Sequence, residues 1–157
     1  MIGVVVVTHG QLATELLNAA ETIVGDLPRF TAVSIGWHED TQDAREEIAQ
    51  AVARVQQGSG VLILTDMFGG TPANLAMTFL AQEATKVEVI TGVNLPMLIK
   101  LASSTEQAEL LHVARDMREH GRNAIWVASD LLRGEKDIKD PNPKPQVQKP
   151  NSQGGLS

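Results

Sequence analysis

The sequence predicts an open α/β/α sandwich in which helices cover both faces of a mainly parallel β-sheet. Short apolar runs rich in β-branched residues alternate along the chain with stretches whose apolar residues recur at helical spacing. Two runs, Val4–Val7 and Val61–Leu64, are apolar at every position, which is typical of strands covered on both faces. The length of 157 residues suits one such core, because domains commonly hold roughly 100–150 residues.

Four strands are expected in the first part of the chain, each followed by a helix: Ile2–Thr8, Thr31–Gly36, Gly60–Thr65 and Lys86–Thr91. We expect them to lie in the order 2-1-3-4, which would place the ends of the first and third strands at the point where the strand order reverses. A fifth strand is predicted at Asn123–Ala128, with Ile125 and Val127 on one face and Trp126 on the other.

The first two helices carry clear end signals. Gly25 is placed to end the first helix, and Asp40 or Thr41 to begin the second, which stops at Gly58. The apolar residues of the first helix predict its inner face as Leu12, Leu16, Leu17, Ala20, Ile23 and Val24.

Three later helices follow. Thr71-Pro72 predicts a helix start with a hydroxyl N-cap and proline at the first helical position. Asn94-Leu95-Pro96 opens a short helix, and Ser104 with Gln107 resembles a capping box for the last helix, which Gly121 closes.

We expect one domain over residues 1–134, followed by a tail. From residue 135 the chain is dominated by Lys, Asp, Pro, Gln, Asn and Gly, with prolines at 141, 143, 145 and 150. Such a composition cannot bury a core, so residues 135–157 are predicted to be a disordered tail or linker.

Composition narrows the function. A net charge of −6 opposes nucleic-acid binding, which usually depends on a basic patch. The absence of cysteine excludes disulfides, thiolate catalysis and cysteine-ligated metals. No run approaches the roughly 20 apolar residues of a membrane helix, and the start lacks the basic region of a signal peptide. We expect a cytoplasmic protein without membrane insertion.

Two predicted strands end in residues that can do chemistry. The first ends in Thr8-His9-Gly10 and the third in Thr65-Asp66. In a parallel sheet these ends share the edge where ligands bind, so His9 should face Asp66. A carboxylate on one imidazole nitrogen fixes the tautomer and leaves the other nitrogen free as a nucleophile.

The segment after Asp66 narrows this chemistry. Gly69 and Gly70 allow successive backbone N–H groups to converge on an anion, and Thr71 adds a hydroxyl donor. A histidine beside an anion cradle indicates phosphohistidine chemistry, with no metal or cofactor expected. Either feature alone is more often a plain turn, but their joint placement on one edge favours a site.

Other sites are disfavoured. His38 is expected in an exposed loop, and His112 and His120 lie in or at the end of a helix without metal-ligand spacing. The chain has no dinucleotide fingerprint, no Walker loop and no nucleophile elbow. The motifs that nucleotide hydrolysis and serine hydrolysis usually require are therefore missing, and both activities are disfavoured.

Three segments together resemble one known family: Thr8-His9-Gly10, Asp66–Pro72 and Gly92–Met97 look like enzyme IIA of the mannose-type sugar phosphotransferase system, over roughly residues 1–130. The resemblance implies a phosphotransferase in which His9 carries the phosphoryl group, Asp66 orients the ring, and Thr71 contacts the phosphoryl group. It also implies a histidine-containing phosphocarrier protein as donor, a IIB domain as acceptor, and a homodimer that exchanges the C-terminal strand.

Alternatives stay open at this point. The chain could be a regulator read through its phosphorylation state, a phosphocarrier subunit of dihydroxyacetone kinase, or a non-catalytic phosphate- or nucleotide-binding module. Apolar residues near the strand ends predict a rim on which partner proteins dock: Met67, Phe68, Leu95, Pro96 and Met97.

Overall fold

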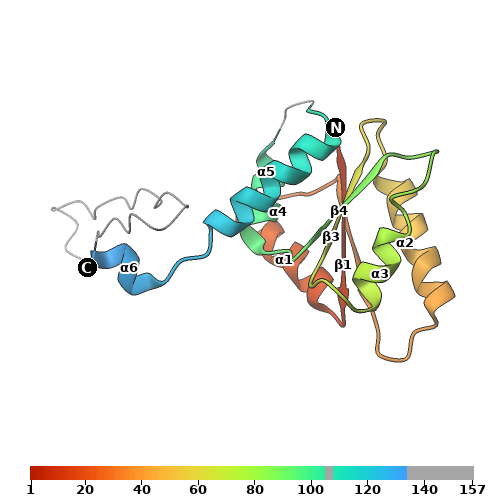
Figure 1. Ribbon diagram of the computed structural model, residues 1–157, viewed down its shortest axis with the longest axis horizontal. Helices are drawn as coiled ribbons and strands as arrows, with labels where there is room; N and C mark the ends of the chain where they lie inside the picture. The colour runs from red at the N-terminus through yellow and green to blue at the C-terminus, as the bar shows by residue number, and fades with distance from the viewer. Residues whose placement is uncertain (105–107, 134–157) are drawn as a thin grey trace. The chain divides into compact units, whose positions relative to one another are not determined.

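The computed structural model describes residues 1–104 and 108–133, and at its centre lies a four-stranded parallel sheet (Figure 1). The strands β1 (Gly3–His9), β2 (Phe30–Ile35), β3 (Val61–Thr65) and β4 (Val87–Thr91) lie in the order β2-β1-β3-β4. The predicted fold class and strand order are confirmed. His9 pairs with Ile35 of β2 and Val7 pairs with Thr65 of β3, so the ends of these three strands meet at one edge, here called the carboxyl edge.

Helices cover both faces of the sheet (Figure 1). α1 (Leu12–Val24), α4 (Leu95–Ser103) and α5 (Leu110–Asn123) contribute to the hydrophobic cluster that contains Val4 and Val6. α2 (Thr41–Val55) and α3 (Thr71–Met77) contribute to the cluster that contains Val5 and Val7. Alternate side chains of β1 therefore enter opposite layers, as the period of a strand requires, and His9 follows Val5 and Val7 onto the α2 and α3 side.

The start of α2 agrees with the prediction from the sequence, whereas the predicted cap of α3 does not. α2 begins at Thr41, one of the two expected starts, and Asp40 caps it, because its carboxylate accepts hydrogen bonds from the N–H groups of Gln42 and Asp43. The predicted hydroxyl cap at Thr71 is wrong, since Gly70 takes the cap position with a φ of 101° and Thr71 becomes the first helical residue. Glycine adopts this conformation without steric cost, so the chain can turn into the helix one residue earlier.

The predicted inner face of α1 was too wide. Ala13, Leu17 and Ala20 are buried, whereas Leu12, Ile23 and Val24 are exposed. At 100° per residue Leu12 and Ile23 lie roughly a quarter-turn from the buried stripe. The small residue Ala13, absent from the predicted face, is fully buried in the cluster that contains Val4 and Val6.

The predicted fifth strand at Asn123–Ala128 is not formed. Asn123 ends α5, residues 124–127 are irregular, and α6 (Ala128–Arg133) follows. Alternating apolar residues suit a strand, but a strand also needs a neighbouring edge for its backbone hydrogen bonds. Here a local turn replaces them in part, because Ile125 N–H donates to the Arg122 carbonyl at 3.3 Å.

The chain divides into two compact units. Residues 1–121 form one compact unit, and the chain from Arg122 onward belongs to a second. The predicted tail at 135–157 and the Gln107 half of the predicted capping box lie outside the described residues. Within the described part of the chain, no helix combines the length and apolarity that crossing a membrane requires.

Candidate active site

His9 and Asp66 meet at the carboxyl edge, as the sequence predicted. His9 Nδ1 lies 2.8 Å from Asp66 Oδ2, and the backbone N–H of His9 donates to the same oxygen at 3.0 Å. The second oxygen, Oδ1, accepts from the Met67 N–H at 3.0 Å. The Asp66 carboxylate is thus held by three donors, and it holds both the ring and the backbone of His9.

The protonation state of Asp66 decides which nitrogen of His9 can react. Partial burial of the carboxyl raises its pKa, but hydrogen bonds from the His9 ring, the His9 N–H and the Met67 N–H, together with the ring's charge, outweigh burial and lower the pKa below the ordinary 3.8. An ionised carboxylate only accepts hydrogen bonds, so Nδ1 must be the donor. The neutral imidazole then keeps its lone pair on Nε2.

Nε2 faces the segment that joins β3 to α3. A Cβ placed on Gly70 would lie 3.2 Å from Nε2 and 3.1 Å from Cε1 of His9. The φ angles of Gly69 and Gly70 are 77° and 101°, a region that side-chain-bearing residues rarely adopt. Gly70 therefore lies against Nε2 of the ring, whereas a Cβ on Gly69 would meet open space. Thr71 follows them as an exposed residue.

Thr8 is a supporting residue that the sequence reasoning missed. Its fully buried hydroxyl accepts a hydrogen bond from the Ala13 N–H at 2.7 Å, which ties the end of β1 to the start of α1. On the other side, Gly10 N–H donates to the Ile35 carbonyl at 2.8 Å. The available signal was a hydroxyl residue directly before His9 and shortly before a helix, a position typical of local side-chain-to-backbone bonds.

The side chains around the site are a mixture of exposed and buried. The His9 side chain is 52% exposed, while that of Asp66 is only 14% exposed. Phe68 and Met67 are exposed, as the docking rim requires, but Met97 is buried in the core and the rim prediction is wrong for it. Met97 packs close to Gly121 of α5, a tertiary contact that its position after Pro96 did not reveal.

The remaining histidines lie elsewhere. His38 is an exposed residue of the loop after β2, where its ring makes an edge contact with Trp37 at 6.4 Å between centroids. His112 and His120 belong to α5. In the described part of the chain no group of three or more His, Asp or Glu residues is arranged to hold a metal ion. The arrangement at His9 can perform nucleophilic chemistry with an imidazole nitrogen.

Comparison with known proteins decides the family. The family model EIIA-man, described as "PTS system fructose IIA component", matches residues 3–117. The chain belongs to this family. It is accordingly a component of a sugar phosphotransferase system, a phosphocarrier that passes phosphate through a histidine.

Individual relatives agree with the family. The chain is 30% identical to the PTS system fructose-specific EIIA component of Bacillus subtilis over 84% of this chain and 90% of that protein. It is 33% identical to the mannose-specific EIIAB component of Escherichia coli K12 over 79% of this chain, but it spans only 39% of that longer protein.

A solved structure extends the agreement to three dimensions. The PTS IIA protein associated with the fucose utilization operon of Streptococcus pneumoniae superposes with a TM-score of 0.72 at 27% identity, over 83% of this chain and 95% of that one. The family membership narrows the open alternatives to a phosphocarrier.

Proposed function

We propose that His9 is the phosphoryl-carrying histidine of this IIA component and that Nε2 is the accepting atom. The observation that carries the proposal is the 2.8 Å contact between His9 Nδ1 and Asp66 Oδ2, which occupies one ring nitrogen and leaves Nε2, beside Gly70, for the phosphoryl group. No other described histidine has a carboxylate on its ring.

The proposed step is an in-line exchange between two nitrogen atoms. The Nε2 lone pair forms a new bond to phosphorus, the bond between phosphorus and the donor's imidazole nitrogen breaks, and its electron pair returns to the donor ring. The proton on Nδ1 stays in its hydrogen bond with Asp66, whose negative charge stabilises the cationic ring that develops. Transfer to the acceptor is the same exchange in reverse: the acceptor's nucleophile forms the new bond to phosphorus, and the bond between phosphorus and Nε2 breaks.

Gly69, Gly70 and Thr71 are the proposed phosphoryl-binding residues. Gly70 lies against Nε2, so the backbone of this segment is adjacent to any group that Nε2 carries. Backbone N–H groups and a hydroxyl are suitable donors for the phosphoryl oxygens. Any side chain at position 70 would take the space beside the nucleophile.

The donor is proposed to be the histidine-containing phosphocarrier protein and the acceptor a IIB domain or subunit, both in the cytoplasm, in a pathway for sugar uptake. The names of the relatives support sugar phosphotransfer in general through fructose-, mannose- and sorbose-specific components. A regulatory role through the same phosphohistidine is compatible with the same site.

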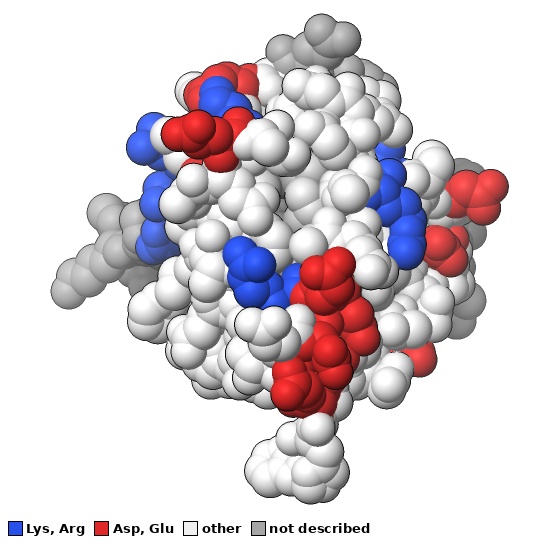
Figure 2. Space-filling model, turned by 90° about the vertical axis from the view of Figure 1, so that its right-hand side faces the viewer, with Lys and Arg blue, Asp and Glu red and all other residues white. Residues whose placement is uncertain are grey.

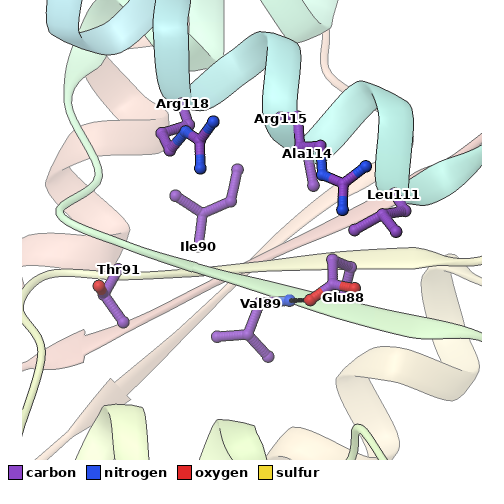
Figure 3. A pocket seen from close by; sticks show the side chains of 8 residues that line it. All are labelled: Glu88, Val89, Ile90, Thr91, Leu111, Ala114, Arg115 and Arg118. Atoms are coloured by element: carbon purple, nitrogen blue, oxygen red, sulfur yellow. Dashed lines mark hydrogen bonds between the residues drawn. The ribbon is translucent and has the colours of Figure 1, made fainter.

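We also propose a homodimer that exchanges residues 123–128. β4 is an edge strand, and beside it lies a groove of about 310 Å³ lined by β4 and by α5 residues that include Arg115 and Arg118 (Figure 3). The alternating Ile125 and Val127 of a second copy could pair with this open edge. A dimer in sedimentation that Ile125→Lys converts to monomer supports the exchange, and a wild-type monomer at all concentrations contradicts it.

The test of the phosphocarrier function is phosphoryl transfer in a defined mixture. The full chain is incubated with labelled phosphoenolpyruvate, enzyme I and the phosphocarrier protein, and the labelled residue is mapped. An acid-labile, base-stable label on His9 is expected. Reversible phosphate binding without covalent label would instead indicate a binding module.

A further inference from the structure

Two exposed aromatic side chains flank the end of β1. Trp37 is 93% exposed and follows β2, and Phe68 is 74% exposed and follows β3. Since β2 and β3 pair with β1 on its two sides, these loops lie on either side of His9. Both loops lead into helices of the same face, α2 and α3, where Val5 and Val7 pack, and His9 shares their side of β1 because side chains alternate along a strand. Phe68 belongs to the docking rim, whereas Trp37 has no role in the site described above.

Trp37 is presented by an ordered turn. Glu39 N–H donates to the Gly36 carbonyl at 3.3 Å, and Gly36 N–H donates to Glu39 Oε2 at 3.0 Å. Asp40, the next residue, caps α2. The turn is thus fixed at the end of β2 and at the start of α2, so the backbone that carries the indole needs little further ordering when a partner covers the side chain.

The charge next to this turn is negative. Acidic side chains gather in a continuous band on the face that α2 covers (Figure 2), and they come from the turn and the first half of α2: Glu39, Asp40, Asp43, Glu46 and Glu47. A hydrogen bond with the Glu39 carboxyl, then burial, then repulsion from Glu39 and Asp43 raise the pKa of Glu47.

One cation, Arg45, lies in the same part of α2. Arg45 is directed to α3, where Nε donates to Thr78 Oγ1 at 3.3 Å and the guanidinium lies 4.9 Å from the centre of the Phe79 ring. An exposed indole beside a band of carboxylates suits a partner that presents an apolar patch bordered by Lys or Arg. Anionic lipid headgroups and nucleic acid would be repelled by the same band.

We propose that Trp37 is a docking residue for the phosphoryl donor protein, seated in an apolar patch of that protein while the donor's basic residues face the acidic band on α2. The proposal rests on the phosphocarrier function proposed for His9. The donor is the occupant because a phosphocarrier needs one in both a transport and a regulatory role, whereas the IIB acceptor belongs to transport alone.

The first test compares Trp37→Ala with Ile23→Ala in the full chain. Ile23 is an exposed apolar residue near the end of α1, remote from the carboxyl edge. Trp37→Ala should raise the KM for the phosphorylated donor about tenfold, as loss of an aromatic interface anchor does, while the rate at saturating donor stays unchanged. Ile23→Ala should leave both within about twofold.

The second test removes charge. Glu46→Gln with Glu47→Gln should raise the KM at low salt and flatten its dependence on salt concentration, because charges at an interface rim act through association rates that salt screens. The matched control is Glu83→Gln, an exposed carboxylate in the loop before β4, which should change neither value.

The outcomes separate this proposal from the phosphocarrier function. Labelling of His9 with an unchanged KM in Trp37→Ala overturns the docking role and leaves the function standing. If wild type takes no label, the proposed phosphocarrier function is wrong. The docking role of Trp37 is then tested separately, by calorimetric titration of wild type and Trp37→Ala with the unphosphorylated phosphocarrier protein. Weaker binding by Trp37→Ala supports the docking role, and equal binding by both proteins or no binding overturns it. Loss of self-association or of vesicle binding at unchanged donor affinity would assign the indole to another surface and overturn the proposal.

Discussion

The middle of β1 and its end differ sharply within a few residues. Val4–Val7 are fully buried between the two helical layers, whereas His9 leaves half of its side chain in solvent. The same contrast holds for two phenylalanines near α3, because Phe79 is fully buried and Phe68 is 74% exposed. The buried interior of the sheet therefore stabilises the fold, whereas the residues at its carboxyl edge are available for chemistry. Substitutions at the two places should therefore change different measurable properties.

The largest expected effect is that of His9→Ala. Phosphoryl acceptance should be abolished while the melting temperature changes little, because a half-exposed residue at the end of a strand contributes little packing. Phosphorylation by the donor system and thermal unfolding measure the two properties. His38→Ala is the matched control and should retain full labelling; labelled His9→Ala would place the phosphoryl group elsewhere.

Asp66→Asn should slow phosphoryl transfer by about 10²–10³-fold without loss of fold, because the amide keeps the size of the side chain but not the charge that stabilises the developing imidazolium. Rapid-quench kinetics at saturating donor give the rate. Asp26→Asn, in the exposed loop before β2, is the control and should transfer at the wild-type rate. A wild-type transfer rate in Asp66→Asn would mean that the charge of Asp66 has no role in phosphoryl transfer.

The two phenylalanines test the contrast directly. Phe79→Ala should lower the free energy of unfolding by about 3–5 kcal/mol, the usual effect of emptying a buried aromatic site. Phe68→Ala should change it by less than about 0.5 kcal/mol and should instead weaken phosphoryl exchange with donor and acceptor. Denaturant unfolding and transfer kinetics distinguish them. A large loss of stability in Phe68→Ala would indicate that Phe68 packs in the core and is not a docking residue.

Gly70→Ala should reduce transfer by about tenfold, a loss of roughly 1.4 kcal/mol of transition-state stabilisation, since its Cβ would lie 3.2 Å from Nε2. Gly58→Ala is a close control, because Gly58 has a φ of 96° and open space where its Cβ would lie. Both variants should lose similar backbone stability of about 1–2 kcal/mol, so only Gly70→Ala should lose transfer. Equal transfer by the two variants would contradict the contact.

The smallest effect concerns acid stability. The pKa of Asp66 is lowered in the folded protein from 3.8, so its stabilisation is fully present above that value and is lost as pH falls through the lowered pKa. The stability difference between wild type and Asp66→Asn should therefore shrink below about pH 4. Unfolding curves across this range measure it, and a difference that grows on acidification would contradict the sign.

The sequence predicted what depends on local pattern. The four parallel strands, their order, the start of α2 and the meeting of His9 with Asp66 all follow from apolar runs, helix-start residues and the geometry of a parallel sheet. The assignment of His9 to phosphotransfer depended on the family resemblance as well, because a histidine beside a carboxylate serves many chemistries.

The sequence predicted less where tertiary contacts decide. Ile125 and Val127 have a strand pattern but form no strand in the single chain, because a strand also needs a partner edge. The exchange between two copies that would provide this edge stays a prediction. Met97 has the position of a rim residue but is buried against α5. Trp37 gave no signal in the sequence because exposure of an indole becomes visible only once the turn at Gly36–Glu39 is built.

The most direct test of the central claim is the chemical position of the phosphoryl group on the ring. Nuclear magnetic resonance of the phosphorylated full chain, with ¹⁵N-labelled histidine, distinguishes phosphate on Nε2 from phosphate on Nδ1. Because Nδ1 is held by Asp66 at 2.8 Å and Nε2 lies against Gly70, phosphate is expected on His9 Nε2 alone. Phosphate on Nδ1 of His9, or on any other histidine, would contradict it.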